Sequence, residues 1–243
     1  MRSVKWLIST LATLTALSIA APGHSKEALT TFENSYTAKL YGFSIEATSR
    51  FKLTGPETGT YQFYFNADSV VGSVTETTHI LWNEKEQVFV PQRYTYKRTG
   101  IGKGRDDELV FDWVNHKVTN IKNNKTLSVE ANSKLQDSLS YQLQLRQDLL
   151  AGKDKLAYTI TNGRKIKKYQ FEIVAEETLK TPLGEVKTVK VKRSNTNENS
   201  ATYAWFAKDF SHLLVQLQQE ENGSAYTIYI SKASINGKAI EHF

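Results

Sequence analysis

The fold is decided by the segment FSIEATSRFKL, residues 43–53. Apolar side chains recur at nearly every second position, and charged or hydroxyl-bearing side chains stand between them. The apolar positions are Phe43, Ile45, Ala47, Phe51 and Leu53, and the polar ones are Ser44, Glu46, Thr48, Arg50 and Lys52. Because successive side chains of a strand point to opposite faces of a sheet, this alternation predicts a β-strand with one buried and one solvated face.

Strand-like segments of the same kind fill most of the chain and are separated by turn signals. Asn-Gly pairs at residues 162–163 and 222–223 each predict a hairpin, because both turn residues need a positive φ angle. We count about thirteen strands, nearly all connected locally, which indicates a meandering antiparallel sheet. The predicted strands are 43–53, 61–65, 70–82, 88–98, 109–113, 118–121, 127–129, 156–161, 165–173, 186–191, 201–207, 213–219 and 225–230.

One segment, SKLQDSLSYQLQLRQDLLA at residues 133–151, departs from this pattern and contains no Gly or Pro. Ser133 with Gln136 can form a capping box, and Gly152 can end a helix. A strand remains an alternative, because apolar side chains also alternate near Tyr141. The expected helical stripe consists of Leu135, Leu139, Leu143 and Leu150, with Arg146 at its margin.

The expected fold is therefore mainly β. It consists of a curved antiparallel sheet or half-barrel of about thirteen strands, with one central helix at about residues 134–151 that plugs or covers the sheet. No linker rich in Pro, Gly or Ser divides the chain into two domains, and no repeat is evident.

The first residues predict a secretory signal peptide. Arg2 and Lys5 give a positive start, and an apolar or small stretch follows up to Ala21 before turn-forming residues suited to cleavage. A retained anchor is the alternative, but hydroxyl side chains dilute the stretch, which is shorter than the ~20 apolar residues of a membrane span. We expect residues 1–25 to be removed and residues 26–243 to form a single β-rich domain in the bacterial periplasm, with no transmembrane anchor.

Composition limits the chemistry of this domain. The chain has 243 residues, of which 40% are hydrophobic, and it has no cysteine. The hydrophobic content argues against a disordered chain. The absence of cysteine excludes disulfide scaffolds, cysteine nucleophiles, thiolate metal sites and lipidation of an N-terminal cysteine. Burial and sheet pairing alone must therefore stabilise the domain.

Familiar catalytic motifs are missing. The five His residues are isolated, so no zinc-enzyme spacing occurs, and there is no G-x-S-x-G elbow. The acidic run Asp106, Asp107 and Glu108 offers carboxylates for glycoside hydrolysis, but a charged turn is the commoner origin of such a run. We expect no metal, no cofactor and no catalytic residue, and we lean towards a protein that is not an enzyme.

Basic residues provide candidates for contact with an anion. The run GRKIKK at residues 163–168 is typical of an edge strand protected by lysines, with acidic lipid headgroups or anionic glycans as alternative partners. The formal net charge of +6 becomes +4 when Arg2 and Lys5 leave with the signal peptide, so a nucleic-acid partner is not expected. Arg146, at the margin of the helical stripe, must either meet a carboxylate such as Asp137 or Asp209 or point into a cavity.

Several motifs, taken in order, resemble the domain-of-unknown-function 3108 family of secreted bacterial proteins. The resemblance covers nearly the whole mature chain. It implies a periplasmic, mostly antiparallel β fold curved around or against a helix, and it implies no established activity and no catalytic residues. The motifs are Pro91 with Tyr94, Phe111-Asp112-Trp113, residues 137–146 (DSLSYQLQLR), Tyr158 with Gly163-Arg164 and Tyr169, Thr181-Pro182-Leu183-Gly184, and residues 205–209 (WFAKD).

These observations lead to a functional hypothesis. A curled sheet with aromatic side chains on its concave side can enclose an apolar cavity, as the sheets of lipid carriers do. The leading hypothesis is a non-enzymatic binding or carrier protein for an amphiphilic envelope component, namely a lipid, an acylated peptide or a glycan. The alternative is a scaffold that regulates envelope machinery through a protein partner, and the third is a glycan hydrolase. The candidate ligand-binding residues are Arg146, Arg164 and Lys208 for the polar part and Tyr61, Phe63, Trp82 and Trp205 for the apolar part.

Overall fold

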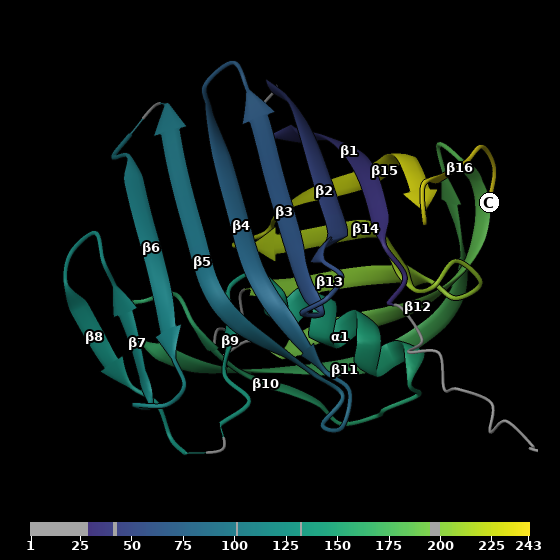
Figure 1. Cartoon of the computed structure of the whole chain (residues 1–243). Helices are drawn as coiled ribbons and strands as arrows, with labels where there is room; N and C mark the ends of the chain where they lie inside the picture. The colour runs from purple at the N-terminus through teal and green to yellow at the C-terminus, as the bar shows by residue number, and fades with distance from the viewer. Residues whose placement is uncertain (1–28, 41–42, 101, 132, 195–199) are drawn as a thin grey trace, which may run out of the picture.

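The computed structural model describes residues 29–40, 43–100, 102–131, 133–194 and 200–243. The predicted signal peptide, residues 1–25, lies outside these ranges. Within them the protein consists of one large curved sheet and one helix, which confirms the predicted mainly β class. Figure 1 shows the strands following one another around a curve, with the helix inside it.

Sixteen strands form this sheet among the described residues. Neighbours in space are mostly neighbours in sequence, so the chain meanders from β8 back to β1 and, on the other side, from β15 back to β9. The strands are β1 (Phe32–Leu40), β2 (Phe43–Gly55), β3 (Thr60–Ser69), β4 (Gly72–Asn83), β5 (Val88–Gly100), β6 (Arg105–Asp112), β7 (Lys117–Asn120), β8 (Lys125–Ser128), β9 (Gln136–Asp137), β10 (Leu156–Thr161), β11 (Ile166–Thr181), β12 (Gly184–Ser194), β13 (Ser200–Ala207), β14 (Leu213–Glu221), β15 (Ser224–Ile235) and β16 (Lys238–Ile240).

The expected local hairpins are present. Asn222 and Gly223 have φ angles of 50° and 79°, as the turn between β14 and β15 requires. Asn162 and Gly163 connect β10 to β11. Pairing between consecutive strands is antiparallel throughout the described meander, whereas β9 runs parallel to β10.

Three strands that the sequence did not predict raise the number from thirteen to sixteen. They are β1, β9 and β16. The last two have two and three residues, too few for an alternation to be recognised. In β1 the buried positions include Asn34, a polar residue that interrupts the apolar series Phe32, Tyr36 and Ala38.

The helix α1 (Ser140–Leu150) begins six residues later than predicted. Residues 136–137 pair with β10 instead, and Asp137, just before the helix, accepts hydrogen bonds from the backbone N–H groups of Leu139 and Ser140 at 2.8 and 2.7 Å. The predicted capping box of Ser133 and Gln136 was therefore wrong. The end of the helix was correct, because Gly152 has a φ of 67° and its N–H donates to the carbonyl of Leu149 at 3.0 Å.

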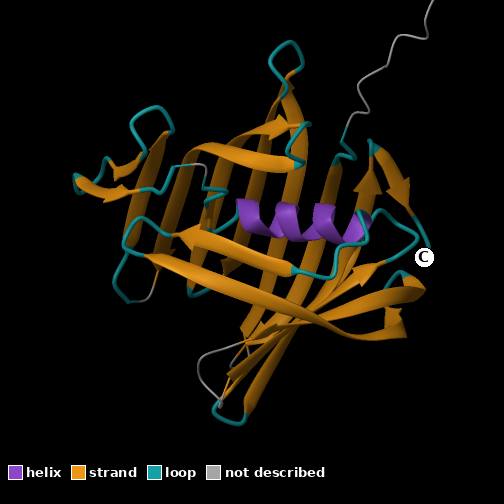
Figure 2. Ribbon diagram, turned by 90° about the horizontal axis from the view of Figure 1, so that it is seen from below, coloured by secondary structure: helices purple, strands orange, loops and turns teal. Residues whose placement is uncertain are grey.

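The helix lies inside the concavity of the sheet (Figure 2). Leu143 packs in one apolar cluster, and Leu145 and Leu149 pack in a second. The predicted stripe was correct for Leu143 but wrong for Leu150, whose side chain is 40% exposed. A single stripe is typical of a helix that rests on one surface, whereas this helix has protein on two sides.

Within the described residues, the two ends of the sheet meet without a strand ladder. The β10–β11 turn contacts the β6–β8 end, where the Arg105 Nη2 donates to the carbonyl of Asn162 at 3.3 Å and the Lys125 Nζ donates to that of Arg164 at 2.8 Å. Gly163 lies directly against the side chain of Leu109. We call this region the seam, defined by the turn at residues 162–164 and by its contacts on β6 and β8.

Candidate functional site

A cavity of about 260 Å³ lies between the helix and the concave face of the sheet. Strands from both halves of the meander and one side of α1 form its wall. The β2 segment that opened the sequence analysis contributes Ser49, and the neighbouring β3 contributes Phe63 and Phe65. The curvature of the sheet and the presence of a central helix together create this space.

Exposure changes across the cavity. Along β13, Phe206 and Ala204 are 5% and 7% exposed, whereas Thr202, further along the same wall, is only half-buried. We call the buried part around Arg146, Phe32, Asn34 and Tyr36 the inner end. We call the half-buried part around Phe65, Glu76, Thr202, Gln219 and Ile228 the outer end. The outer end is thus the more exposed part of the cavity wall.

Arg146 dominates the inner end. It is 5% exposed and lines the cavity, and its guanidinium lies 5.0 Å from the ring centroid of Phe32. Its Nη1 donates to the carbonyl of Thr30 at 3.4 Å, whereas its Nε and Nη2 are buried without a hydrogen-bond partner. Among the described residues, no carboxylate forms a salt bridge with it, and Asp137 instead accepts from Thr78 at 2.6 Å.

Burial lowers the pKa of Arg146 to about 10, so the group remains a cation at neutral pH. The Arg146 charge also affects His212. The pKa of His212 is lowered mainly by burial and, as the second cause, by repulsion from the Arg146 cation. The Nδ1 atom of His212 is itself buried without a partner. The inner end therefore holds a positive charge that the described residues leave uncompensated.

Neutral polar groups surround this charge. Tyr36 Oη donates to the carbonyl of Leu214 at 3.1 Å and lies 3.4 Å from Ser49 Oγ, while Asn34 Nδ2 donates to Tyr36 Oη at 3.1 Å. The Oδ1 atom of Asn34 is buried without a partner. Buried polar groups are normally hydrogen-bonded, so several orphan atoms at one end of a cavity indicate a place for a polar ligand group.

Aromatic and ionisable groups mark the outer end. Glu76 accepts a hydrogen bond from Tyr94 Oη, and burial raises the pKa of its carboxyl to about 7. Tyr141, at the start of the helix, lies with its ring parallel to that of Phe171 at 6.1 Å, and burial raises its pKa to about 12. Arg193 lies over the ring of Tyr169, 4.9 Å from its centroid.

The aromatic residues proposed from the sequence divide between the cavity and the core. Phe63 lines the cavity. Tyr61 stacks on Phe51 at 5.1 Å, and Trp82 packs on Phe89 at 4.8 Å, so both contribute to the core instead. Trp205 donates from Nε1 to Glu177 at 2.6 Å.

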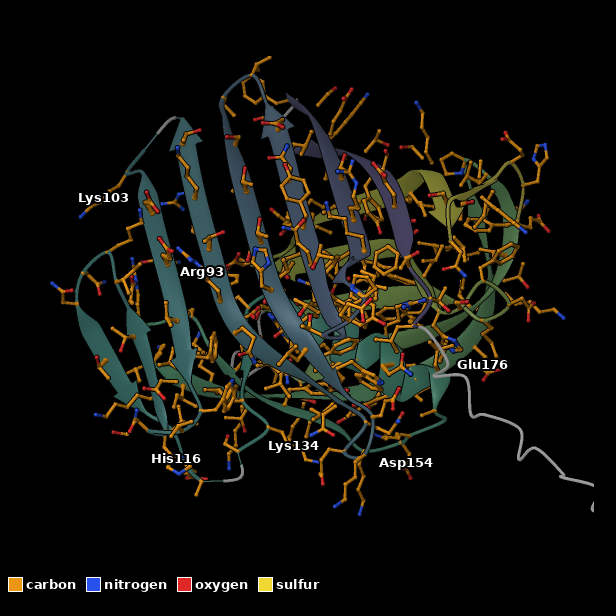
Figure 3. The ribbon with its side chains drawn as sticks, viewed as in Figure 1. Arg93, Lys103, His116, Lys134, Asp154 and Glu176 are labelled. Carbon is orange, nitrogen blue, oxygen red and sulfur yellow. The ribbon has the colours of Figure 1, made fainter. Side chains whose placement is uncertain are left out.

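The basic residues proposed from the sequence are also separated. Arg146 lines the cavity. Lys208 forms an ion pair of 2.5 Å with Glu176, which Figure 3 labels at the outer margin of the molecule. Arg164 is an exposed residue of the seam. The cavity thus brings together Arg146 and Phe63, and the other five candidates lie elsewhere.

Sequence reasoning missed the polar groups around Arg146. Asn34 and Tyr36 lie on β1, which was not recognised as a strand. Ser49 offered a signal, because it interrupts the buried apolar face of the segment FSIEATSRFKL at a central position. A polar residue on a buried face requires a partner or a function.

The carboxylates of the acidic run on β6 form salt bridges with Arg and Lys side chains. Asp107 pairs with Arg105, Glu108 with Arg93, and Asp106 with Lys122 at 3.6 Å. Figure 3 labels Arg93 on β5, beside the β6 strand that carries Glu108.

Over the described ranges, no cluster of three His, Asp or Glu side chains suits a metal ion. In the same ranges, no helix has the length and apolar character that crossing a membrane requires.

Comparison with known proteins identifies relatives by family and by fold. The family model described as a protein of unknown function (DUF3108) matches residues 27–231. A beta-barrel-like protein of domain of unknown function DUF1849 from Brucella abortus superposes with a TM-score of 0.55 at 11% identity, over 86% of this chain and 99% of the other. A Bacteroides fragilis protein with a YmcC-like fold covers 84% of this chain and 94% of its own, at 12% identity and a TM-score of 0.32. No protein of curated function shows significant sequence similarity.

Proposed function

The chain belongs to the DUF3108 family, and from this premise we propose that it is a non-enzymatic binding or carrier protein for an amphiphilic component of the cell envelope. The observation that carries the proposal is Arg146, a buried cation with two unpartnered donors in the wall of a largely apolar cavity. An apolar pocket with a few convergent polar groups is the usual form of a small-molecule site. A lipid, an acylated peptide or a glycan remains the proposed ligand class.

The shared fold agrees with this function without specifying it. A curved sheet around a helix can enclose a ligand, as in other β folds that hold small molecules. The Brucella abortus structure shows that this architecture occurs in another family, and its likeness concerns the fold alone. The support for the proposed function therefore comes from the residues that line the cavity of this chain.

The proposed location is the bacterial periplasm. The apolar N-terminal stretch would act as a cleaved signal peptide, and the chain has no cysteine for a lipid anchor. A carrier would be useful in the periplasm, because amphiphiles are poorly soluble in the aqueous space between the two membranes. Fractionation of cells that express the full chain tests this location.

Native mass spectrometry tests the binding function. The full chain, expressed with its own N-terminus and purified from the periplasm without detergent, is expected to carry an adduct of lipid-like mass. The variant Arg146→Met is expected to lose this adduct, and Arg164→Met, a matched change at an exposed Arg outside the cavity, is expected to keep it. A bare mass for the wild-type protein would contradict the proposal.

A scaffold function is the second candidate. Ile173 and Val174 lie at a bulge of β11 with 46% and 44% of their surface exposed, so β11 offers adjacent apolar side chains to a protein partner. The bare mass described above, together with an envelope protein that copurifies with the wild type but not with a variant carrying Ile173→Ser and Val174→Ser, would favour this candidate.

A further inference from the structure

We infer that the inner end binds the carboxylate of a single-chain fatty acid, with the headgroup inserted first and the chain directed to the outer end. This inference rests on the proposed function and names its ligand class and the orientation of that ligand. The two observations behind it are the unused atoms of Arg146 and the distribution of apolar wall residues along the cavity.

The free atoms of Arg146 match a carboxylate. Its Nη1 is used by the carbonyl of Thr30, and the atoms without partners are Nε and Nη2. These two donors lie on the same edge of the guanidinium plane and point in parallel directions, so they can bind both oxygens of one carboxylate. The ring of Phe32, 5.0 Å from the guanidinium, gives the cation an aromatic neighbour at the inner end.

The charge balance favours an anion at this position. Burying an unpaired cation in a protein interior costs free energy, and an anionic partner offsets that cost. The described residues provide no such partner, and Arg146 is 5% exposed, so water compensates it poorly. A ligand carboxylate would complete the ion pair that the chain leaves open.

The rest of the wall suits one alkyl chain. Between Arg146 and the outer end the cavity is lined by Phe63, Phe65, Ala204, Leu217 and Ile228. Its volume of about 260 Å³ lies below the range of roughly 300–1,000 Å³ that is usual for drug-sized ligands. A lipid with two acyl chains needs more space, and a glycan offers little apolar surface to these five side chains. A single saturated chain satisfies both limits.

Calorimetric titration of the delipidated full chain tests the headgroup. The probes are dodecanoate, methyl dodecanoate, dodecanol and dodecyl phosphate, which share one chain and differ at the head. Dodecanoate is expected to bind at least tenfold more tightly than the ester and the alcohol. It is also expected to bind more tightly than the phosphate, because the two free donors match the two oxygens of a carboxylate and leave the third free oxygen of a phosphate buried without a donor.

Two substitutions test the role of Arg146. Arg146→Met is expected to bind dodecanoate at least tenfold more weakly and no better than the ester, while Arg146→Lys, which keeps the charge but not the two parallel donors, is expected to lie between. Arg164→Met is expected to behave as the wild type. Arg146→Met is also expected to melt at the same or a higher temperature than the ligand-free wild type, because it removes an unpaired buried charge.

The outcomes separate this inference from the proposed function. Equal affinity for dodecanoate and its methyl ester, stronger binding of dodecyl phosphate, or unchanged binding by a folded Arg146→Met would overturn the inference. If periplasmic protein carries an adduct that is not a fatty acid, the inference falls and the proposed function stands. If it carries no adduct and binds none of the four probes, both fall.

Discussion

Two ionisable residues in the cavity wall are partly or fully buried, although their charged forms are more stable in water. Arg146 is a buried cation, and Glu76 is a carboxyl whose pKa burial raises to about 7. Both lower the stability of the empty protein at neutral pH, since each is desolvated without full compensation. Such groups are concentrated at functional sites, which is a further reason to place the candidate site in this cavity.

Glu76 predicts how stability depends on pH. Its pKa in the folded protein, about 7, lies above the ordinary value of 4.5, so the folded state binds the proton more tightly than the unfolded state. The resulting stabilisation is fully present below about pH 4.5 and is lost as the pH rises to about 7. The variant Glu76→Gln, which keeps a neutral side chain, is expected to be more stable than the wild type at pH 8 and to differ less from it at pH 5.

Thermal unfolding at the two pH values measures this difference. Asp137 is also buried with a raised pKa, so the comparison between the wild type and Glu76→Gln, rather than the wild-type curve alone, isolates Glu76. The variant Glu185→Gln is a suitable control, because Glu185 is exposed and forms only a surface ion pair of 3.5 Å with Lys180. A Glu76→Gln protein that is equally destabilised at both pH values would contradict the prediction.

Sequence reasoning identified one of these residues and missed the other. Arg146 was recognisable because a charged residue stood beside the apolar stripe of a predicted helix. Glu76 was not, because the strand it occupies alternates apolar and polar residues weakly, and its hydrogen-bond partner Tyr94 lies on the next strand. A contact between strands is invisible in the pattern of either strand alone.

Elements of the sheet differ in how their connections are built. Most hairpin turns are exposed, but the β10–β11 turn also packs against the β6–β8 end. Gly163 has a φ of 76°, and a Cβ atom at this position would overlap the Leu109 side chain. This turn therefore needs glycine for two reasons, its backbone conformation and the close approach of Leu109.

A pair of matched substitutions separates the two reasons. Gly163→Ala and Gly223→Ala occur in turns with nearly the same φ, 76° and 79°, but a Cβ at Gly223 meets nothing within 4 Å. Both are expected to lose about 1 kcal/mol for the backbone conformation. Gly163→Ala is expected to lose about 1–3 kcal/mol more, because overpacking displaces Leu109. Urea unfolding measures both losses, and equal losses would show that the seam is not tightly packed.

Elements with strong local signals were predicted well. Alternation and Asn-Gly turns located thirteen strands, and Gly152 located the end of the helix. The start of the helix was wrong because the pairing of residues 136–137 with β10 outweighs their helical tendency. Short strands and strands with polar inward positions carry too little local information to be recognised.

The whole molecule depends on one non-local pairing. The strand β1 lies between β2 and β15, so it connects the first half of the meander to the last. Phe32 pairs with Phe51 on one side and with Ile235 on the other. Because β15 lies near the end of the chain, the sheet cannot be completed until nearly all of the chain is available, and we expect slow folding.

Deletion variants test this dependence. Removal of residues 32–40 is expected to abolish cooperative unfolding, because β2 and β15 lose their common neighbour and the two halves of the sheet separate. Removal of residues 238–243 serves as the control. It takes away β16, which pairs with β15 over only three residues, and it is expected to keep a cooperative transition. Circular dichroism on heating distinguishes the two, and a sharp transition without β1 would contradict the expectation.

At this scale the sequence predicted a curved sheet with an internal helix but not the arrangement of its cavity. Local connection favours an antiparallel meander, and its curvature follows from the twist of strands. The position of Arg146 relative to Asn34 depends on where β1, a strand far away in sequence, lies in the sheet. No periodicity within either segment contains that information.

The seam has a consequence for the width of the concavity. In a closed barrel the circumference is fixed by the number and stagger of the strands. Here the two margins of the described sheet touch through side chains and turn carbonyls, and no strand ladder joins them. The circumference is therefore set at the seam by side-chain packing, with Leu109 packed against Gly163, so the width of the concavity depends on these side chains and not on strand register alone.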